Sequence, residues 1–170
     1  MTAQPIVGGE QGIDAEQFRM IFRGHPAGVA VVTLHDGSRA YGFTATSVIS
    51  VSAEPPLFAF SVHKASSSWS ALSRVRRVMI NFLAEDQADV AARFATSGID
   101  RFAAGGWHPL PTGEPVLAGC SGWIEGRVRS RVPAAGSRLI IAQAAAAWSS
   151  GLSPLIYRDH TYHRLAAQET

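Results

Sequence analysis

Apolar residues at the start of the chain recur with helical spacing. In residues 14–23 the hydrophobic side chains fall on one stripe, and Asp14 with Gln17 forms a start that resembles a capping box. Gly24 follows at the point where a helix commonly ends. We therefore expect one short helix over residues 14–23, and we interpret the polar, Gly-rich residues 1–13 as a flexible arm.

The hydrophobic pattern becomes strand-like beyond residue 28. Residues 28–34 (GVAVVTL) are rich in β-branched side chains, and Asp36-Gly37 predicts a tight hairpin turn before a return strand over 39–48. Four further segments are strand candidates, and the Ala run in the last of them, residues 138–148, is also compatible with a helix on propensity alone. These further strand candidates are 57–62, 77–83, 122–132 and 138–148.

Two helices and one long loop interrupt these strands. Residues 66–75 begin with hydroxyl caps, and residues 85–95 open with acidic residues and place apolar ones at helical intervals. Residues 98–119 form a Gly/Pro-rich, aromatic segment, and a loop of that length is usually functional or a subunit contact. Many strands and few helices predict a mainly β, barrel-like single domain over residues 14–166.

Composition limits the class of protein without defining it. A 170-residue chain that is 46% hydrophobic and 16% charged can bury one core and retain apolar surface for a subunit interface or a flat aromatic ligand. A net charge of +2 is too mild for nucleic-acid binding. Arg127, Arg129 and Arg131 share one strand face, which we interpret as a solvated or interface face, or else as an anion or partner site.

Several kinds of chemistry have no support in the sequence. The single cysteine, Cys120, excludes an internal disulfide and is typical of packing, and His160 with His163 lacks the further ligands of a metal site. The sequence has no nucleophile elbow, Walker loop or Rossmann glycine turn. We see no secretory signal, and no apolar run approaches the roughly 18 to 20 residues of a membrane span. We expect a soluble cytoplasmic protein without a metal or a membrane partner.

Residues 44–72 are apolar but repeatedly interrupted by hydroxyls. Such a segment could serve a flavin ring, which needs an apolar floor, polar groups along one edge and an anion site for its phosphate. Lys64, Ser67 and Ser68 precede a predicted helix, whose N-terminus would attract that phosphate. The alternative is structural, because Ser and Thr are common in edge strands and helix caps.

The order of motifs along the chain resembles the flavin reductase-like domain family, the FMN-binding split barrel. The stretches that carry the resemblance are FRMIFRGHPAGVAVVTLHDGSRAYGFTATSVISVSAEPPLFAFSV, VMINFLAEDQADVAARFA, DRFAAGGW, GEPVLAGCSGWIEGRV and PLIYRDHTY, and they cover about residues 18–164. The resemblance implies a homodimer of split barrels that binds FMN or FAD. It also implies reduction of the flavin by NADH or NADPH, with reduced flavin passed to a partner monooxygenase or halogenase.

The resemblance also assigns expected roles to individual residues. No side chain is expected to be catalytic in the strict sense, because hydride transfer is chemistry of the cofactors. Pro55 and Pro56 are interpreted as structural, ending one strand and starting the next. The implied flavin contacts are Thr44, Thr46 and Ser47 at the ring edge, Ser50 and Val51 at the ring and ribityl side, Ser61, Lys64, Ser67 and Ser68 at the ribityl-phosphate end, Asn81 and Phe82 facing the flavin, and Arg101 and Phe102 against the phosphate or the partner subunit.

One position departs from the family pattern. Members that bind nicotinamide commonly carry Gly-Asp-His before a strand, whereas this chain has Gly136, Ser137 and Arg138. Arg138 could bind the pyrophosphate of the nucleotide instead, as a permanently charged bidentate donor. Two alternatives remain open: a flavin-binding carrier or sensor without reductase activity, and a divergent flavin-dependent enzyme of secondary metabolism.

Overall fold

The computed structural model describes residues 12–166. Most of the expected N-terminal arm, residues 1–11, therefore lies outside the described residues. Helix α1 (Ala15–Gly24) confirms the first predicted helix, because the Asp14 side chain accepts from the backbone of Glu16 and Gln17 and closes a capping box. No helix among the described residues is long and apolar enough to cross a membrane.

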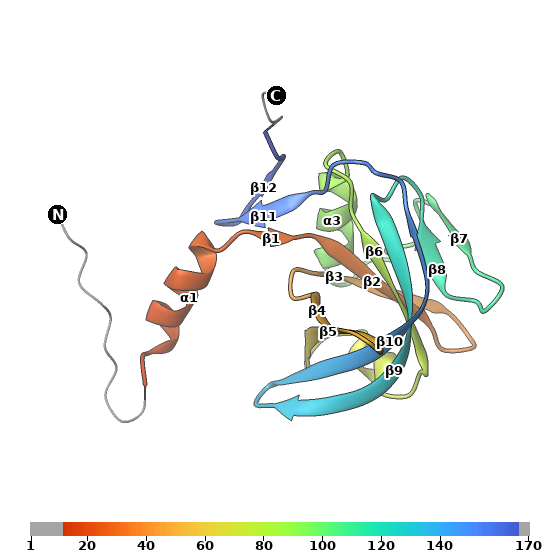
Figure 1. The fold of residues 1–170 in the computed structure, drawn as a ribbon, viewed down its shortest axis with the longest axis horizontal. Helices are drawn as coiled ribbons and strands as arrows, with labels where there is room; N and C mark the ends of the chain where they lie inside the picture. The colour runs from red at the N-terminus through yellow and green to blue at the C-terminus, as the bar shows by residue number, and fades with distance from the viewer. Residues whose placement is uncertain (1–11, 167–170) are drawn as a thin grey trace.

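A seven-stranded antiparallel sheet dominates the fold (Figure 1). Six of the strands confirm the predicted ones, and β4 was not among them. The Ala-rich segment pairs on both sides as a strand because its neighbours satisfy its backbone groups. Within residues 12–166 no ladder joins the two edge strands, so the expected barrel is not closed by hydrogen bonds. In sheet order the strands are β3 (Ala40–Ala45), β2 (Ala30–His35), β6 (Arg77–Phe82), β9 (Gly122–Ala134), β10 (Ser137–Ser149), β5 (Pro56–His63) and β4 (Ile49–Ala53).

Smaller elements complete the described chain. The predicted long loop contains a hairpin of β7 (Trp107–Pro109) and β8 (Pro115–Leu117), and a small sheet joins β1 (Ala27–Gly28), β11 (Ile156–Arg158) and β12 (Thr161–His163). The sequence pattern did not predict these short strands. Helix α3 (Ala88–Ala95) agrees with the helix expected over residues 85–95, although it starts later.

The other predicted helix is only one turn long. The expectation of a helix over residues 66–75 is wrong beyond α2 (Trp69–Leu72). Arg131, which projects from β9, donates to the backbone carbonyls of Leu72 and Val75. This long-range contact stabilises the carbonyl end of the turn, and it could not be seen in the local sequence.

The hydrophobic core lies on both faces of the sheet. Along β2, Val32 belongs to the cluster with Phe60, whereas Val31 belongs to the cluster with Phe94 of α3. A Cβ on Gly42 of β3 would lie 2.7 Å from the Phe94 ring. The glycine therefore lets α3 approach the sheet closely, and this approach positions the segment that follows α3.

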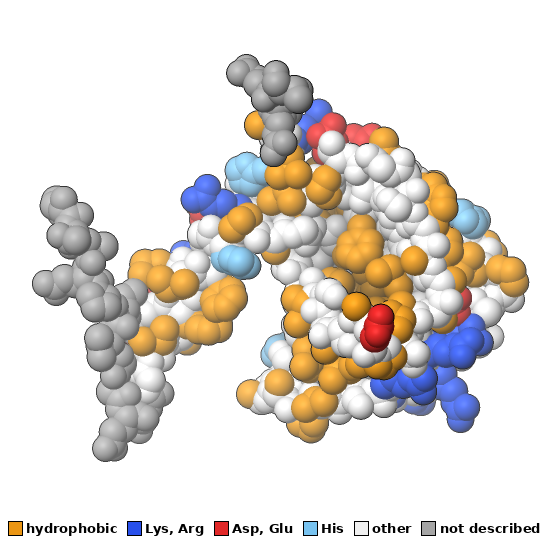
Figure 2. Space-filling model, in the orientation of Figure 1, with side chains coloured by type: hydrophobic (Ala, Val, Ile, Leu, Met, Phe, Trp, Pro, Cys, Tyr) orange, Lys and Arg blue, Asp and Glu red, His pale blue; other side chains and the backbone are white. Residues whose placement is uncertain are grey.

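Helix α1 has no buried residue and projects away from the sheet (Figure 1). Its aromatic residues Phe18 and Phe22 are 53% and 57% exposed, and their rings lie 4.6 Å apart. Figure 2 shows hydrophobic side chains along this projecting helix. The helix therefore presents an apolar stripe that the described residues of the same chain do not cover.

Candidate functional site

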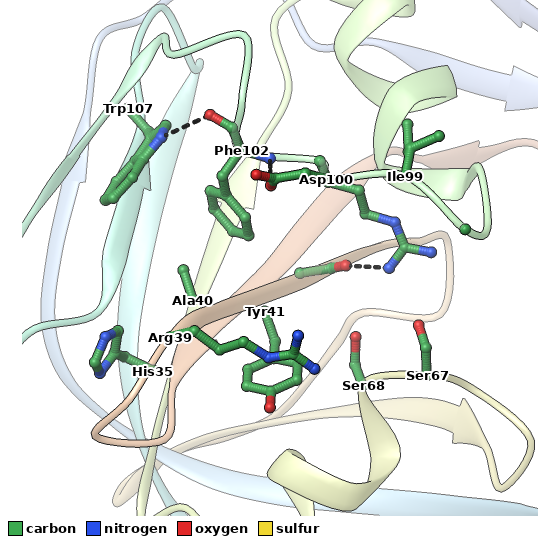
Figure 3. Close-up of a pocket in the computed structure, with 13 residues that line it drawn as sticks. His35, Arg39, Ala40, Tyr41, Ser67, Ser68, Ile99, Asp100, Phe102 and Trp107 are labelled. Atoms are coloured by element: carbon green, nitrogen blue, oxygen red, sulfur yellow. Dashed lines mark hydrogen bonds between the residues drawn. The ribbon is translucent and has the colours of Figure 1, made fainter.

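Two neighbouring cavities form where three segments meet: the β2–β3 hairpin, residues 61–68, and residues 95–107 after α3. The larger cavity has a volume of about 690 Å³ and the smaller about 320 Å³. Figure 3 shows side chains from all three segments around the larger cavity. The predicted site residues in these walls are Thr44 and Ser61 in the smaller cavity, Ser68 and Phe102 in the larger, and Ser67 and Arg101 in both.

Arg101 is a partly buried cation in the wall between the cavities. Its Nε donates to the Thr96 carbonyl at 2.9 Å and its Nη1 to the Gly42 carbonyl at 2.6 Å. Among residues 12–166 no carboxylate lies within 4.0 Å of it. Burial lowers the pKa of the Arg101 guanidinium from its ordinary value, because desolvation disfavours the charge. An anion in either cavity would offset that cost.

The smaller cavity combines hydroxyls with apolar walls. Thr44 donates its hydroxyl to the Ala91 carbonyl of α3 at 2.6 Å, so its oxygen can still accept from a ligand. Ser61 is exposed at the cavity, whereas the rings of Phe43 and Phe94 lie behind its wall, at 9% and 0% exposure. This arrangement suits a ligand with apolar faces and a polar edge.

Aromatic and basic side chains line the larger cavity. The Phe102 ring packs edge to face against Trp107, with centroids 5.3 Å apart, and the Trp107 Nε1 donates to the Phe102 carbonyl. The sequence interpretation assigned no role to His35, Arg39, Tyr41 or Trp107, all of which line this cavity. Two signals were present: Arg39 and Tyr41 alternate onto one strand face, and Trp107 lies in the long aromatic loop already expected to be functional.

Asn81 occupies the core instead of either cavity. It is fully buried, and its Nδ2 donates to the Val31 carbonyl and the Thr33 hydroxyl. Its Oδ1 accepts from the Leu117 backbone at 2.9 Å. The Asn81 amide joins β6 to β2 and β8 and has no exposed surface, so the structure does not bring this side chain to either cavity, and its expected contact with a flavin stays a prediction.

Other predicted flavin contacts lie outside these two cavities. The Ser47 hydroxyl accepts from the Ser61 backbone at 3.0 Å and so ties the turn after β3 to β5. Phe82 lines a separate apolar hollow with Trp123 and Trp148. The remaining residues are exposed: Thr46 after β3, Ser50 and Val51 on the edge strand β4, and Lys64 after β5. Their flavin contacts stay predictions.

Arg138 lies beside the segment expected to hold the flavin phosphate. In the β10–β5 pairing it is opposite Val62, and the Gly136 carbonyl accepts from the Lys64 backbone at 2.9 Å. The Arg138 guanidinium donates to the Ser137 carbonyl and lies 5.8 Å from the Trp69 ring. The fold therefore brings the altered Gly-Ser-Arg motif next to residues 61–64, far away in the sequence.

The predicted helix N-terminus is a weaker anion site than expected. Helix α2 has a single turn, and the backbone N–H groups of Trp69 and Leu72 already donate to the carbonyls of Ser66 and Ser68. A helix this short has too few aligned peptides for a useful dipole. Attraction for an anion at this place therefore comes from guanidinium groups and serine hydroxyls.

Cys120 is buried at 2% exposure, in agreement with its interpretation as a packing residue. Burial raises the pKa of its thiol to about 12, because the thiolate would lose its hydration. A thiol in this state is not an activated nucleophile at neutral pH.

Comparison with known proteins identifies the fold and its family. A model of the flavin reductase like domain matches residues 22–166. The chain is 42% identical over 159 residues to an NADH:FMN oxidoreductase of Rhodococcus qingshengii, an alignment that covers 90% of this chain and 83% of the relative. The protein belongs to the flavin reductase-like domain family.

Solved structures of similar proteins share the architecture. An NADH:FAD oxidoreductase of Streptomyces globisporus C-1027, solved in complex with NAD and FAD fragments, superposes with a TM-score of 0.87 at 25% identity, covering 96% of this chain and 98% of the other. The flavin reductase component of a bacterial two-component tryptophan halogenase superposes with a TM-score of 0.83 at 26% identity, covering 91% of this chain and all of the other.

Proposed function

We propose that this protein is an NAD(P)H:flavin oxidoreductase that supplies reduced flavin to a separate flavin-dependent monooxygenase or halogenase. The observation that carries the proposal is the guanidinium of Arg101, partly buried and without a carboxylate partner among the described residues, at the wall of a cavity lined by hydroxyls. Such a group fits the phosphate end of a flavin nucleotide. The similarity to oxidoreductases that use NADH with FMN or FAD supports the same function.

The residues of the smaller cavity fit a flavin. Phe43 and Phe94 form a buried apolar layer behind the wall, Thr44 and Ser61 offer hydroxyls, and Arg101 offers charge. A bound flavin would supply the hydride-accepting ring, and the protein would bind both nucleotides, orient them and exclude water. No side chain is required to move a proton, so the activity depends on positioning.

Arg138 is proposed to contact the pyridine nucleotide. Its place beside residues 61–64 supports this role, because the nucleotide must approach the flavin held there. Expected behaviour is a rise in the Michaelis constant for NADH when Arg138 becomes Ala, without a change in flavin affinity. An unchanged Michaelis constant would make Arg138 a structural residue of the hairpin.

A homodimer is proposed as the working form. The uncovered apolar stripe of α1 supports it, because exposed patches of this kind commonly mark subunit contacts. A second subunit would also cover the open edges of the split barrel. Light scattering on the full chain tests this: a monomer at micromolar concentration would contradict it.

The decisive experiment is an NADH oxidation assay at 340 nm with FMN or FAD, repeated with NADPH. Turnover above the blank without protein is expected. Tight flavin binding with no turnover would instead favour a flavin carrier or sensor, which the Gly-Ser-Arg substitution would explain. Stimulation of a purified flavin-dependent oxygenase by the protein and NADH tests the transfer of reduced flavin.

A further inference from the structure

We propose that the larger cavity is a subsite for an adenosine diphosphate group, so that the site as a whole takes a flavin dinucleotide in preference to the mononucleotide. The inference rests on the proposed function, because it names the flavin used by the same site. Its main residues are Arg39, Tyr41 and Trp107, which line the larger cavity only, together with the shared wall.

The two cavities are neighbours that share Ser67 and Arg101 in their walls. A flavin mononucleotide in the smaller cavity with its phosphate at this wall would leave the larger cavity to water. A dinucleotide extends from that phosphate by a second phosphate and an adenosine. The larger cavity begins where the mononucleotide ends, and its volume of about 690 Å³ is within the range of pockets for small-molecule ligands.

The charge of the larger cavity suits a diphosphate. The Arg39 guanidinium lies 4.5 Å above the centre of the Tyr41 ring, and among residues 12–166 no carboxylate is within 4.0 Å of it. Figure 3 shows this guanidinium over the ring, with the side chains of Ser67 and Ser68 across the cavity. Arg39 and Arg101 therefore supply two cations to the walls of one cavity.

Asp100 is the carboxylate that lines this cavity, and after the contact with Tyr41 the charges of Asp36 and Asp100 also raise the pKa of the Arg39 guanidinium. The Asp100 Oδ1 accepts from the Phe102 backbone N–H at 3.0 Å, so the carboxylate stabilises the loop. Two guanidinium groups against one carboxylate leave the lining cationic. This balance favours a dianionic group over a neutral ligand.

Aromatic rings suit the base at the far end. The rings of Phe102 and Trp107 meet at an interplanar angle of 77°, and the Tyr41 ring projects from β3. The three rings are partly exposed at the cavity. Adenine stacks on aromatic and guanidinium surfaces without needing a specific hydrogen-bond code.

Binding measurements on the full chain test the subsite. We expect FAD to bind about tenfold or more tightly than FMN, because stacking and charge contacts in the larger cavity add to those in the smaller. AMP alone, which lacks the phosphate that FAD shares with FMN, is expected to compete with FAD but not with FMN. Arg39→Gln and Tyr41→Leu should lower FAD affinity and leave FMN affinity unchanged, and Arg127→Gln, an exposed arginine that lines neither cavity, is the control.

The outcomes separate the subsite from the proposed function. If both flavins bind equally, AMP does not bind and Arg39→Gln changes no affinity, the subsite is wrong while flavin binding stands. If neither flavin binds, the proposed function itself fails. Arg39→Gln could instead raise only the Michaelis constant for NADH at saturating FMN. That result would mean that the adenosine diphosphate half of the pyridine nucleotide occupies the larger cavity. It would support an adenosine diphosphate subsite there and reject the flavin dinucleotide as its ligand.

Discussion

The inner strand β6 and the loop after α3 use polar residues in opposite ways. Asn81 on β6 is fully buried, and both its amide nitrogen and its oxygen have partners from other strands. Arg101 in the loop is partly buried and has two backbone partners, but no anion balances its charge among the described residues. A saturated polar group holds the fold together, whereas a cation left without a counter-charge beside a cavity marks a place for a ligand.

The largest expected effect comes from Asn81→Leu. The change leaves the buried groups of Val31, Thr33 and Leu117 without their partner, so the free energy of unfolding should fall by about 2 to 4 kcal/mol. Urea unfolding measures it, with Thr46→Ala at an exposed position as the control. Wild-type stability combined with lost flavin binding would show that Asn81 faces the ligand after all.

The second-largest loss of stability is expected for Gly42→Ala. The free energy of unfolding should fall by about 1 to 3 kcal/mol, because the new methyl group would overlap the Phe94 ring. The change also displaces the carbonyl that holds Arg101, so flavin affinity should fall with stability. Gly28→Ala is the matched control, since nothing lies within 4 Å of a Cβ there. Equal midpoints for the two variants would contradict the close approach of α3 to β3.

Arg101→Lys tests the other side of the comparison. A lysine retains the charge but cannot hold two carbonyls and a phosphate in one plane, so flavin affinity should fall about tenfold, or about 1.4 kcal/mol, with a smaller effect on stability. Fluorescence titration measures the affinity, and Arg127→Lys is the control. A stability loss as large as that of Asn81→Leu, with affinity unchanged, would assign Arg101 to the fold.

The smallest effect at neutral pH is expected for Cys120→Ala. The folded pKa of about 12 lies above the ordinary value of 9.0, so the thiol contributes stability that is complete below pH 9 and is lost as pH rises toward 12. The free energy of unfolding should fall less steeply above pH 9 in the variant than in the wild type. Rapid labelling of the native thiol at pH 8 by iodoacetamide would contradict its burial.

Local sequence chemistry predicted much of the sheet but little of its long-range contacts. The hairpin at Asp36 was predictable because its carboxylate accepts from the backbone of Ser38 and Arg39, a short-range device. The length of α2 was not, because Arg131, more than fifty residues away, holds its carbonyl end. Short strands such as β7 and β8 carry too few residues for a period to show.

The candidate flavin site was likewise predictable where its residues are close in the sequence and unpredictable where the fold brings them together. Hydroxyls at Thr44, Ser61 and Ser67 could be read as a ligand segment, since they cluster in the sequence and also in space. The strand pattern could not tell whether Asn81 faces a ligand or a neighbouring strand, because β6 is buried on both faces. The sequence could not assign Arg39 to a ligand site, because only the fold brings it to the same cavity as the loop after α3.

Gly42 has two roles: its missing Cβ makes room for the Phe94 ring, and its carbonyl accepts from Arg101. A substitution at position 42 therefore affects the packing of α3 and the cavity wall together. A side chain at position 42 should become tolerable only together with a smaller one at position 94, so the double substitution Gly42→Ala with Phe94→Leu should be less harmful than the two single effects added together. Substitutions at positions 42 and 94 are then expected to occur together, so that the cavity wall and helix α3 change in a coordinated way.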